Sequence, residues 1–265
     1  MLALTRPFGT LHVQVDGPDD APAVVFANSL GTDLRLWEAV LPLLPRGLRL
    51  IRYDKRGHGL SGGLGDRLED HAEDAVAVIE ALAKGPVIMV GLSVGGLIAQ
   101  RVASDRPDLI RALVLSNTGA RLGSAESWQA RIDAVEAHGL GAIADAVMAR
   151  WFAAPFRARA ELALWRAMLM RSPTDGYVAT CRALASADQT GATARLHLPA
   201  LVIAGAEDGA SPPEVVEALA RLLPGAAFHC LPGAGHLPCV ETPEAWAALV
   251  SPFLIAHAQR IPGHV

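Results

Sequence analysis

The sequence predicts an α/β protein with a mostly parallel, doubly wound sheet and an inserted helical cap. Strand-like and helix-like segments alternate over the first 116 residues and again after residue 199, which is typical of βαβ units. Between them, from about residue 120, the strand signal disappears and helix-like segments follow one another. We therefore expect an α/β core made of residues 1–119 and 195–265, and a helical cap made of residues 120–194.

Short apolar or alternating runs identify the strands of the core. They cover residues 11–15, 23–27, 48–53, 86–90, 111–116, 200–204 and 227–231. Apolar residues spaced three and four positions apart identify the helices, which cover residues 69–83, 96–103, 127–137, 142–152, 159–170, 175–187, 213–222 and 244–258. Sheets of this kind bind ligands at the carboxyl ends of their strands, so we expect the cap to lie there.

Composition excludes several classes of partner. The net charge of −4 gives no reason to expect nucleic acid or an anionic membrane. The three cysteines, Cys181, Cys230 and Cys239, have no metal-binding spacing, so we expect no metal site and buried thiols in a reducing compartment. The N-terminus does not resemble a signal peptide, and the longest apolar run is too short to span a bilayer. These observations predict a soluble, cytoplasmic protein.

Residues 91–95 read Gly-Leu-Ser-Val-Gly and lie between an expected strand and an expected helix. A G-x-S-x-G motif in this context is typical of a nucleophile elbow, a sharp turn that exposes a reactive serine. Glycines two residues before and after the serine remove side chains that would collide in the turn. We therefore predict that Ser93 is a catalytic nucleophile.

A serine nucleophile needs a histidine base and a carboxylate that orients it. In an elbow architecture both follow the serine along the chain, on loops after late strands. Asp208 is the preferred carboxylate, with Glu207 as its local competitor, and His236 in a Gly-rich loop is the preferred base. His58, which also lies in a glycine-flanked loop, is the main rival. The other histidines are expected to be surface or packed residues: His12, His71, His138, His197, His229, His257 and His264.

Acyl transfer also requires donors for the developing oxyanion. The backbone N–H of Val94, directly after the nucleophile, is one expected donor. The second should come from the loop after the strand at 23–27, where the backbone N–H of Leu30 is the best placed.

With these residues identified, the chain resembles the α/β-hydrolase family and, within it, the 3-oxoadipate enol-lactonase branch, whose members act in bacterial aromatic degradation. The matching stretches are 28–33, 52–59, 91–96, 117–121, 149–152, 205–208 and 235–238. Asn28 departs from the histidine that opens its loop in many relatives, and this departure itself resembles the lactonase branch. The resemblance implies the α/β-hydrolase fold and the hydrolysis of an enol-lactone to 3-oxoadipate without a cofactor.

The substrate implied by the resemblance is a small anionic lactone with an acetate arm, so the pocket needs a cation. Arg121, Arg131 and Arg150 in the cap are candidates, and Trp128 and Trp151 could wall the pocket. Each could equally have an ordinary structural role. Three alternatives stay open: a general carboxylesterase, a hydrolase of carbon–carbon bonds, and a binding protein without turnover. The sequence leaves the oligomeric state open, a homo-oligomer included.

Overall fold

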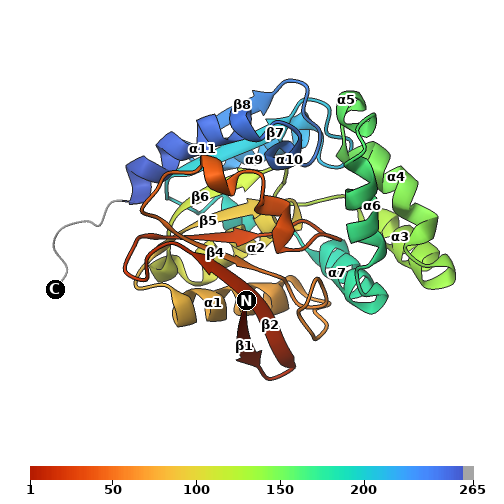
Figure 1. The fold of residues 1–265 in the computed structure, drawn as a ribbon, viewed down its shortest axis with the longest axis horizontal. Coiled ribbons are helices and arrows are strands. Elements are labelled where there is room, and N and C mark those ends of the chain that lie inside the picture. Colours follow the sequence, from red (N-terminus) through yellow and green to blue (C-terminus); the bar gives the residue numbers. More distant parts are fainter. Residues whose placement is uncertain (259–265) are drawn as a thin grey trace.

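Eight strands form one sheet at the centre of the computed structural model, which describes residues 1–258 (Figure 1). Residues 259–265 of the expected core, including His264, lie outside the described residues. The strand order is β1-β2-β4-β3-β5-β6-β7-β8. The strands are β1 (Leu2–Arg6), β2 (Gly9–Asp16), β3 (Ala23–Ala27), β4 (Arg49–Tyr53), β5 (Val87–Leu92), β6 (Ile110–Ser116), β7 (Ala200–Gly205) and β8 (Ala227–Leu231).

The sheet is parallel from β4 through β8, and β1 and β2 join it as an antiparallel hairpin beside β4. The prediction of a mostly parallel sheet is therefore confirmed. Strand β1 was not predicted. It is an exposed edge strand that pairs on one side only, so its sequence carries little of the apolar signal of a buried strand.

Helices cover both faces of the sheet (Figure 1). Helices α1 (Leu68–Leu82) and α2 (Val94–Asp105) pack together, and α2 also contacts β3, β5 and β6. Helix α11 (Pro243–Ala258) contacts β5 and β6 and lies on the side of the sheet away from α1. Helix α9 (Pro213–Leu222) packs beside β7 and β8. This arrangement confirms the doubly wound architecture.

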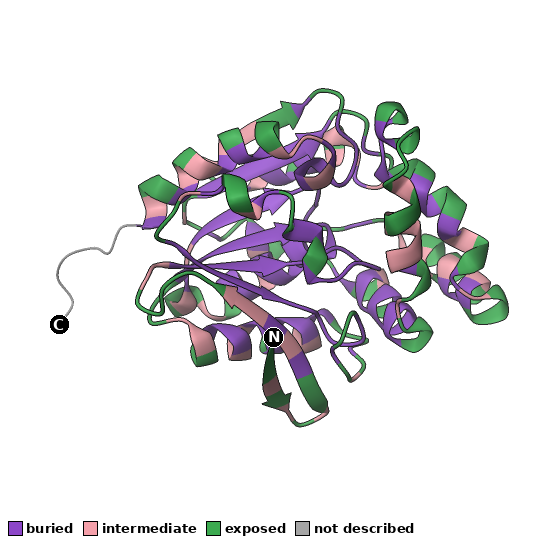
Figure 2. Ribbon diagram, viewed as in Figure 1, coloured by how far each residue is buried: buried purple, intermediate pink, exposed green. Residues whose placement is uncertain are grey.

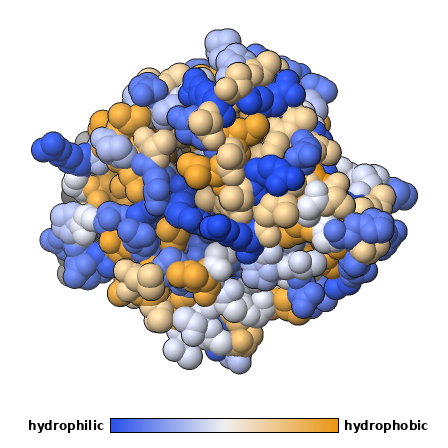
Figure 3. Space-filling model, turned by 45° about the vertical axis from the view of Figure 1, so that its right-hand side comes forward, coloured by the Kyte–Doolittle hydropathy of each residue, from blue (hydrophilic) through white to orange (hydrophobic). Residues whose placement is uncertain are grey.

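The core is the sheet and the apolar helix faces that pack on it, as the burial pattern in Figure 2 shows. Strands β3, β4, β5 and β7 are buried along their whole length, as is usual for parallel strands covered on both faces. On the face shown in Figure 3, apolar and hydrophilic residues are interspersed in small patches. No helix within residues 1–258 combines the length and apolar character that crossing a bilayer requires.

Between β6 and β7 the chain forms α3 (Ala125–His138), α4 (Gly141–Trp151), α5 (Ala154–Arg157), α6 (Leu162–Met170), α7 (Thr174–Ser186) and α8 (Thr190–Thr193). Helices α3 to α7 gather at one end of the sheet, at the right of Figure 1. The four long helices match the predicted segments, although α6 begins at Leu162 rather than at 159. The short helices α5 and α8, like α10 (Pro238–Glu241) in the core, were not predicted.

The cysteines correct one prediction. All three are free thiols, and Cys181 and Cys239 are buried as expected, but Cys230 is exposed. Cys230 lies on β8, which forms the edge of the sheet and is mostly accessible to solvent.

Candidate active site

Ser93 lies at the junction of β5 and α2, in a backbone conformation that L-residues rarely adopt. Its φ of 58° and ψ of −122° place it outside the allowed regions. Neighbouring groups hold this strained turn: Ser93 N donates to Ser116 O at 3.1 Å, and Ser93 O accepts from Gly96 N at 2.8 Å and from Thr118 Oγ1 at 2.7 Å. The turn has the strand–turn–helix geometry of a nucleophile elbow, as the motif predicts.

The glycines of the motif are required by close backbone approach rather than by positive φ. A Cβ atom on Gly91 would overlap with the backbone of Gly95, and one on Gly95 would overlap with the carbonyl of Ala27 on the neighbouring strand. A Cβ on Gly96 would collide with the side chain of Thr118. The elbow can therefore form only where these positions lack side chains.

Asp208 and His236 lie on the loops after β7 and β8 and meet at the carboxyl end of the sheet. His236 Nδ1 is 2.8 Å from Asp208 Oδ2, and both residues are buried. Asp208 Oδ1 accepts from the backbone N–H groups of Ala210 at 2.7 Å and Ser211 at 2.9 Å. The competitor, Glu207, is exposed. The carboxylate is thus fixed behind the imidazole, as an orienting group should be.

Asn117 is a further member of this site that sequence reasoning missed. Its Nδ2 donates to Asp208 Oδ2 at 2.9 Å and to Gly235 O at 3.0 Å, so it joins the carboxylate to the histidine loop. Asn117 has a φ of 51°, a left-handed conformation that asparagine tolerates better than most residues. In the sequence, Asn117 stands directly after the strand β6 and within the stretch 117–121 that resembles the family, but neither signal gave it a role.

The expected oxyanion donors are both available. Val94 is the first residue of α2, where an N–H group has no partner within the helix, and Leu30 lines the cavity at Ser93. Within residues 1–258, neither backbone N–H donates to a protein acceptor. Ser93 Oγ and His236 share no hydrogen bond, although both face the same cavity.

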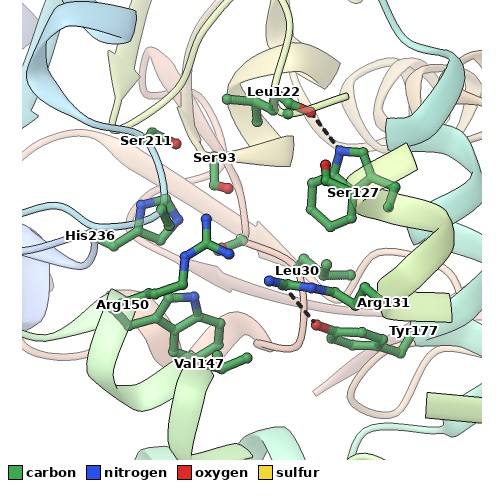
Figure 4. Close-up of a pocket in the computed structure, with 15 residues that line it drawn as sticks. Leu30, Ser93, Leu122, Ser127, Arg131, Val147, Arg150, Tyr177, Ser211 and His236 are labelled. Atoms are coloured by element: carbon green, nitrogen blue, oxygen red, sulfur yellow. Dashed lines mark hydrogen bonds between the residues drawn. The ribbon is translucent and has the colours of Figure 1, made fainter. Parts of the chain in front are cut away.

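The cavity in front of Ser93 has a volume of about 140 Å³. A cavity of about 150 Å³ can hold a benzene-sized molecule, so this one suits a small ring. Its walls come from the core loops and from cap helices α3, α4 and α7 (Figure 4). The lining residues are Ser29, Leu30, Ser93, Leu122, Gly123, Ser127, Trp128, Arg131, Val147, Arg150, Trp151, Tyr177, Ala210, Ser211 and His236.

Two guanidinium groups, those of Arg131 and Arg150, point toward each other inside this cavity (Figure 4). Arg150 Nε donates to Gly209 O at 2.8 Å, and Arg131 Nη1 lies 3.5 Å from Tyr177 Oη. The pKa of Arg150 is lowered, first by burial and then by the charge of Arg131, while burial raises the pKa of Tyr177 to about 12. Two like charges held this close favour the binding of an anion between them.

Of the other residues predicted for the site or considered as rivals, some line the cavity and some do not. Trp128 and Trp151 line the cavity; Trp128 Nε1 donates to Leu122 O at 2.6 Å, and Trp128 supports Arg131, whose guanidinium carbon lies 5.2 Å from its ring centre. Arg121 does not line this cavity: it is exposed and borders a different groove, beside helix α9. The reason is its position on the segment that leaves β6, before the chain turns into α3. The rival base His58 is fully buried and also lies outside the cavity.

The end of α4 is joined directly to the loops that carry Asp208 and His236. The Arg150 carbonyl accepts from Gly209 N at 3.1 Å, and the Trp151 carbonyl accepts from His236 N at 2.7 Å. The Glu241 carboxylate accepts from Ala153 N at 2.7 Å and from Gly235 N at 2.9 Å, and burial raises its pKa. The helix that supplies Arg150 is therefore fixed to the loops that carry Asp208 and His236.

The family, sequence and structure comparisons with known proteins agree with one another. Residues 22–243 match the family described as alpha/beta hydrolase fold. The chain is 33% identical to 3-oxoadipate enol-lactonase 1 of Acinetobacter baylyi over 96% of both chains. It is similar in structure to the enol-lactonase of Burkholderia xenovorans, with a TM-score of 0.91, 34% identity and coverage of 96% of this chain and all of the other. A malate-bound esterase of Thermogutta terrifontis has a TM-score of 0.89 and 29% identity, covering 97% and 99% of the two chains.

Proposed function

The chain belongs to the α/β-hydrolase family, and on that premise we propose that it hydrolyses 3-oxoadipate enol-lactone, a small anionic lactone, through an acyl-enzyme on Ser93. The observation that carries the proposal is the pairing of two features in one cavity. The elbow serine and the His236–Asp208 pair supply the chemistry, and the two facing guanidinium groups supply a site for a carboxylate (Figure 4).

In the proposed reaction, Ser93 Oγ attacks the lactone carbonyl while His236 Nε2 takes its proton. Asp208, hydrogen-bonded to Nδ1, orients the imidazole and stabilises the imidazolium. The negative charge on the carbonyl oxygen is stabilised by the backbone N–H groups of Leu30 and Val94. The tetrahedral intermediate collapses and breaks the ring C–O bond.

The leaving group is an enolate, which takes the proton held by His236 and tautomerises to the ketone, so His236 returns to its neutral form. A water molecule, activated by His236, then attacks the acyl-enzyme and releases the acid and Ser93. All steps of the proposed reaction use only side chains and backbone groups of this chain. It adds one water molecule and consumes no other reactant.

The substrate class is supported by three observations. The cavity is small, and Arg131 and Arg150 place two positive charges in it. Its relatives include enol-lactonases at 33% and 34% identity. A similar esterase was solved with malate, a dicarboxylate, which is consistent with an anion-binding pocket on this fold.

The test is a direct ultraviolet assay of enol-lactone opening, beside a panel of simple lactones and esters. We expect the enol-lactone to have the highest kcat/KM of the panel. Ser93→Ala should lose turnover by about 10⁴-fold or more, and still bind the product acid. Ser127→Ala is the matched control, because Ser127 also lines the cavity but its hydroxyl donates to Ser124 O.

Other outcomes would identify other functions. Faster hydrolysis of neutral esters than of the enol-lactone would favour a general carboxylesterase. If p-nitrophenyl acetate releases no p-nitrophenol at all, neither in a burst nor by steady turnover, the result would favour a binding protein. Turnover by Ser93→Ala at the wild-type rate would refute the acyl-enzyme.

A further inference from the structure

The segment 53–55, which is the last residue of β4 and the two residues after it, holds the loop that carries the Leu30 N–H. Three consecutive residues take part. Tyr53 O accepts from Asn28 Nδ2 at 2.8 Å, Asp54 Oδ1 accepts from Leu34 N at 2.8 Å, and Lys55 Nζ donates to Ser29 O at 2.6 Å and to Thr32 O at 3.3 Å. The loop 28–34 is thus fixed at both ends and at its centre.

Lys55 is an unusual residue for a purely structural contact. It is only 2% exposed, and among the residues described no carboxylate lies within ion-pair distance of its Nζ. Burial lowers the pKa of Lys55 to about 7, while the charges of Asp54 and Asp33 oppose this shift. Placing an ammonium group in such surroundings is costly, because its two hydrogen bonds go to backbone carbonyls, which do not neutralise the charge. A neutral side chain could fill the same space more cheaply.

The position of the ammonium suggests what it contributes. The carbonyl of Ser29 and the N–H of Leu30 belong to the same peptide group, and in a trans peptide they point in opposite directions. Lys55 therefore donates to the oxygen of the peptide group that carries the expected Leu30 N–H donor, and both Ser29 and Leu30 line the cavity at Ser93. The same oxygen accepts from Thr32 Oγ1 at 2.9 Å and from Thr32 N at 3.3 Å, which are uncharged donors. A charged donor on a peptide oxygen polarises that peptide and makes its N–H a stronger donor, as in hydrogen-bonded chains.

We propose that Lys55 is a positioning residue for the oxyanion site: it fixes the Ser29–Leu30 peptide and polarises it toward the charge that develops on the substrate oxygen. The inference rests on the proposed function in taking Ser93 as the nucleophile and Leu30 N–H as an oxyanion donor. The effect is largest when the oxygen carries a full negative charge. Lys55 thus stabilises the transition state more than the bound substrate, and its loss lowers kcat rather than raising KM.

The test compares wild type, Lys55→Met and Lys84→Met. Lys84 is the chain's other lysine and lies near the surface, so its replacement controls for the loss of a positive charge. Complete loss of an oxyanion donor costs about 10²–10³ in kcat, so weakening one should cost about 10- to 100-fold. We expect this fall for Lys55→Met on both p-nitrophenyl acetate and the enol-lactone, with KM almost unchanged and Lys84→Met like wild type.

Inhibitor binding separates this role from a general structural one. Phenylboronic acid forms a tetrahedral adduct on a reactive serine, and its inhibition constant should rise by the same factor as kcat falls. The inhibition constant of 3-oxoadipate, the planar product acid, should stay unchanged. Lys55→Gln keeps an N–H donor without the charge and should fall between wild type and Lys55→Met, and it also serves if Lys55→Met does not fold.

Two results would overturn the inference: unchanged kcat in the folded variants, or equal weakening of boronate and product binding. Failure of the proposed function would look different. If the enol-lactone is not a substrate, the role of Lys55 is still tested by kcat on p-nitrophenyl acetate and by the inhibition constant of phenylboronic acid. If Ser93→Ala still hydrolyses esters, the nucleophile assignment fails whatever Lys55 does.

Discussion

Replacing Arg131 by methionine should weaken the binding of an anionic substrate while sparing neutral ones. Methionine keeps an unbranched apolar side chain but removes the guanidinium, which lies over the Trp128 ring and points at Arg150 (Figure 4). Because Arg131 lowers the pKa of Arg150, the two charges repel each other in the free enzyme. The same substitution should therefore leave the free energy of unfolding unchanged or slightly higher.

The magnitude follows from the contacts that the cavity offers. A hydrogen bond to a charged group contributes about 1.5–3 kcal/mol. Arg150 is partly exposed to solvent, and Arg131 only intermediately buried, so the lower end of this range applies. About 1.4 kcal/mol corresponds to a tenfold change in affinity. We expect KM for the anionic lactone to rise about tenfold in Arg131→Met and in Arg150→Met. The double variant should lose less than the product of the two factors if both groups hold one carboxylate.

The assay is steady-state kinetics on the enol-lactone and on its methyl ester, which has the same ring without the charge. Arg121→Met is the control, since Arg121 lies outside the cavity. The argument fails if KM rises by the same factor for the acid and for its ester. It also fails if Arg121→Met is as damaging as the two cavity variants.

Three further predictions concern the elbow, the carboxylate and the buried histidines. Gly95→Ala should destabilise the fold by about 1–3 kcal/mol or more in urea unfolding and abolish turnover, because the added methyl meets the Ala27 carbonyl. Asn117→Gly tolerates the φ of 51° but loses the hydrogen bond to Asp208, so kcat should fall about tenfold at constant KM. The free energy of unfolding should fall as the pH drops below about 6.5, because burial lowers the pKa of His71 from 6.5 to about 3. The histidine of the unfolded chain therefore takes up a proton at a higher pH than that of the folded chain. The loss of stability is at most about 5 kcal/mol once the pH has fallen to about 3.

Each of these has a clear contrary result. A fully active Gly95→Ala protein would mean that the close approach of β3 to the elbow is not required. Wild-type kcat in Asn117→Gly would show that the backbone N–H groups on the other oxygen of Asp208 suffice. For the acid effect, His71→Gln should have a shallower pH dependence of stability, and an unchanged slope would assign the effect to other groups.

The fold was predictable from the sequence because its signals are local. Parallel strands covered on both faces must be apolar throughout, and β3 matches its predicted segment at both ends. The helix α9 and the edge strand β8 also match their predicted segments at both ends. The elements that were missed are an exposed edge strand and one-turn helices. Their conformation depends on tertiary contacts rather than on periodicity. The residue bounds of the cap, 120–194, stay a prediction.

The site was predictable to a different degree. Ser93, Asp208 and His236 could be singled out because glycine turns follow their strands, and the structure brings them to one end of the sheet; their catalytic roles stay predictions. The choice among the cap arginines could not be made, since it depends on how each helix is rotated against the sheet. Asn117 and Lys55 lie in stretches that resemble the family, but their hydrogen bonds reach loops that are distant in the sequence, and no local pattern shows those contacts.

The attachment of the α4 end to the loops of Asp208 and His236 limits how such a cap can be exchanged. Helix α7 contacts α1 of the core, and α3 packs on α7 and α4. In the part of the chain that the structure describes, neither helix has such main-chain links to the loops of Asp208 and His236, so their sequences are freer to vary with the substrate. Residues 150–153 are different, because their carbonyl and N–H groups complete the hydrogen bonding of the catalytic loops. A chimera that joins the cap of another protein to this core should therefore keep residues 150–153 of this chain.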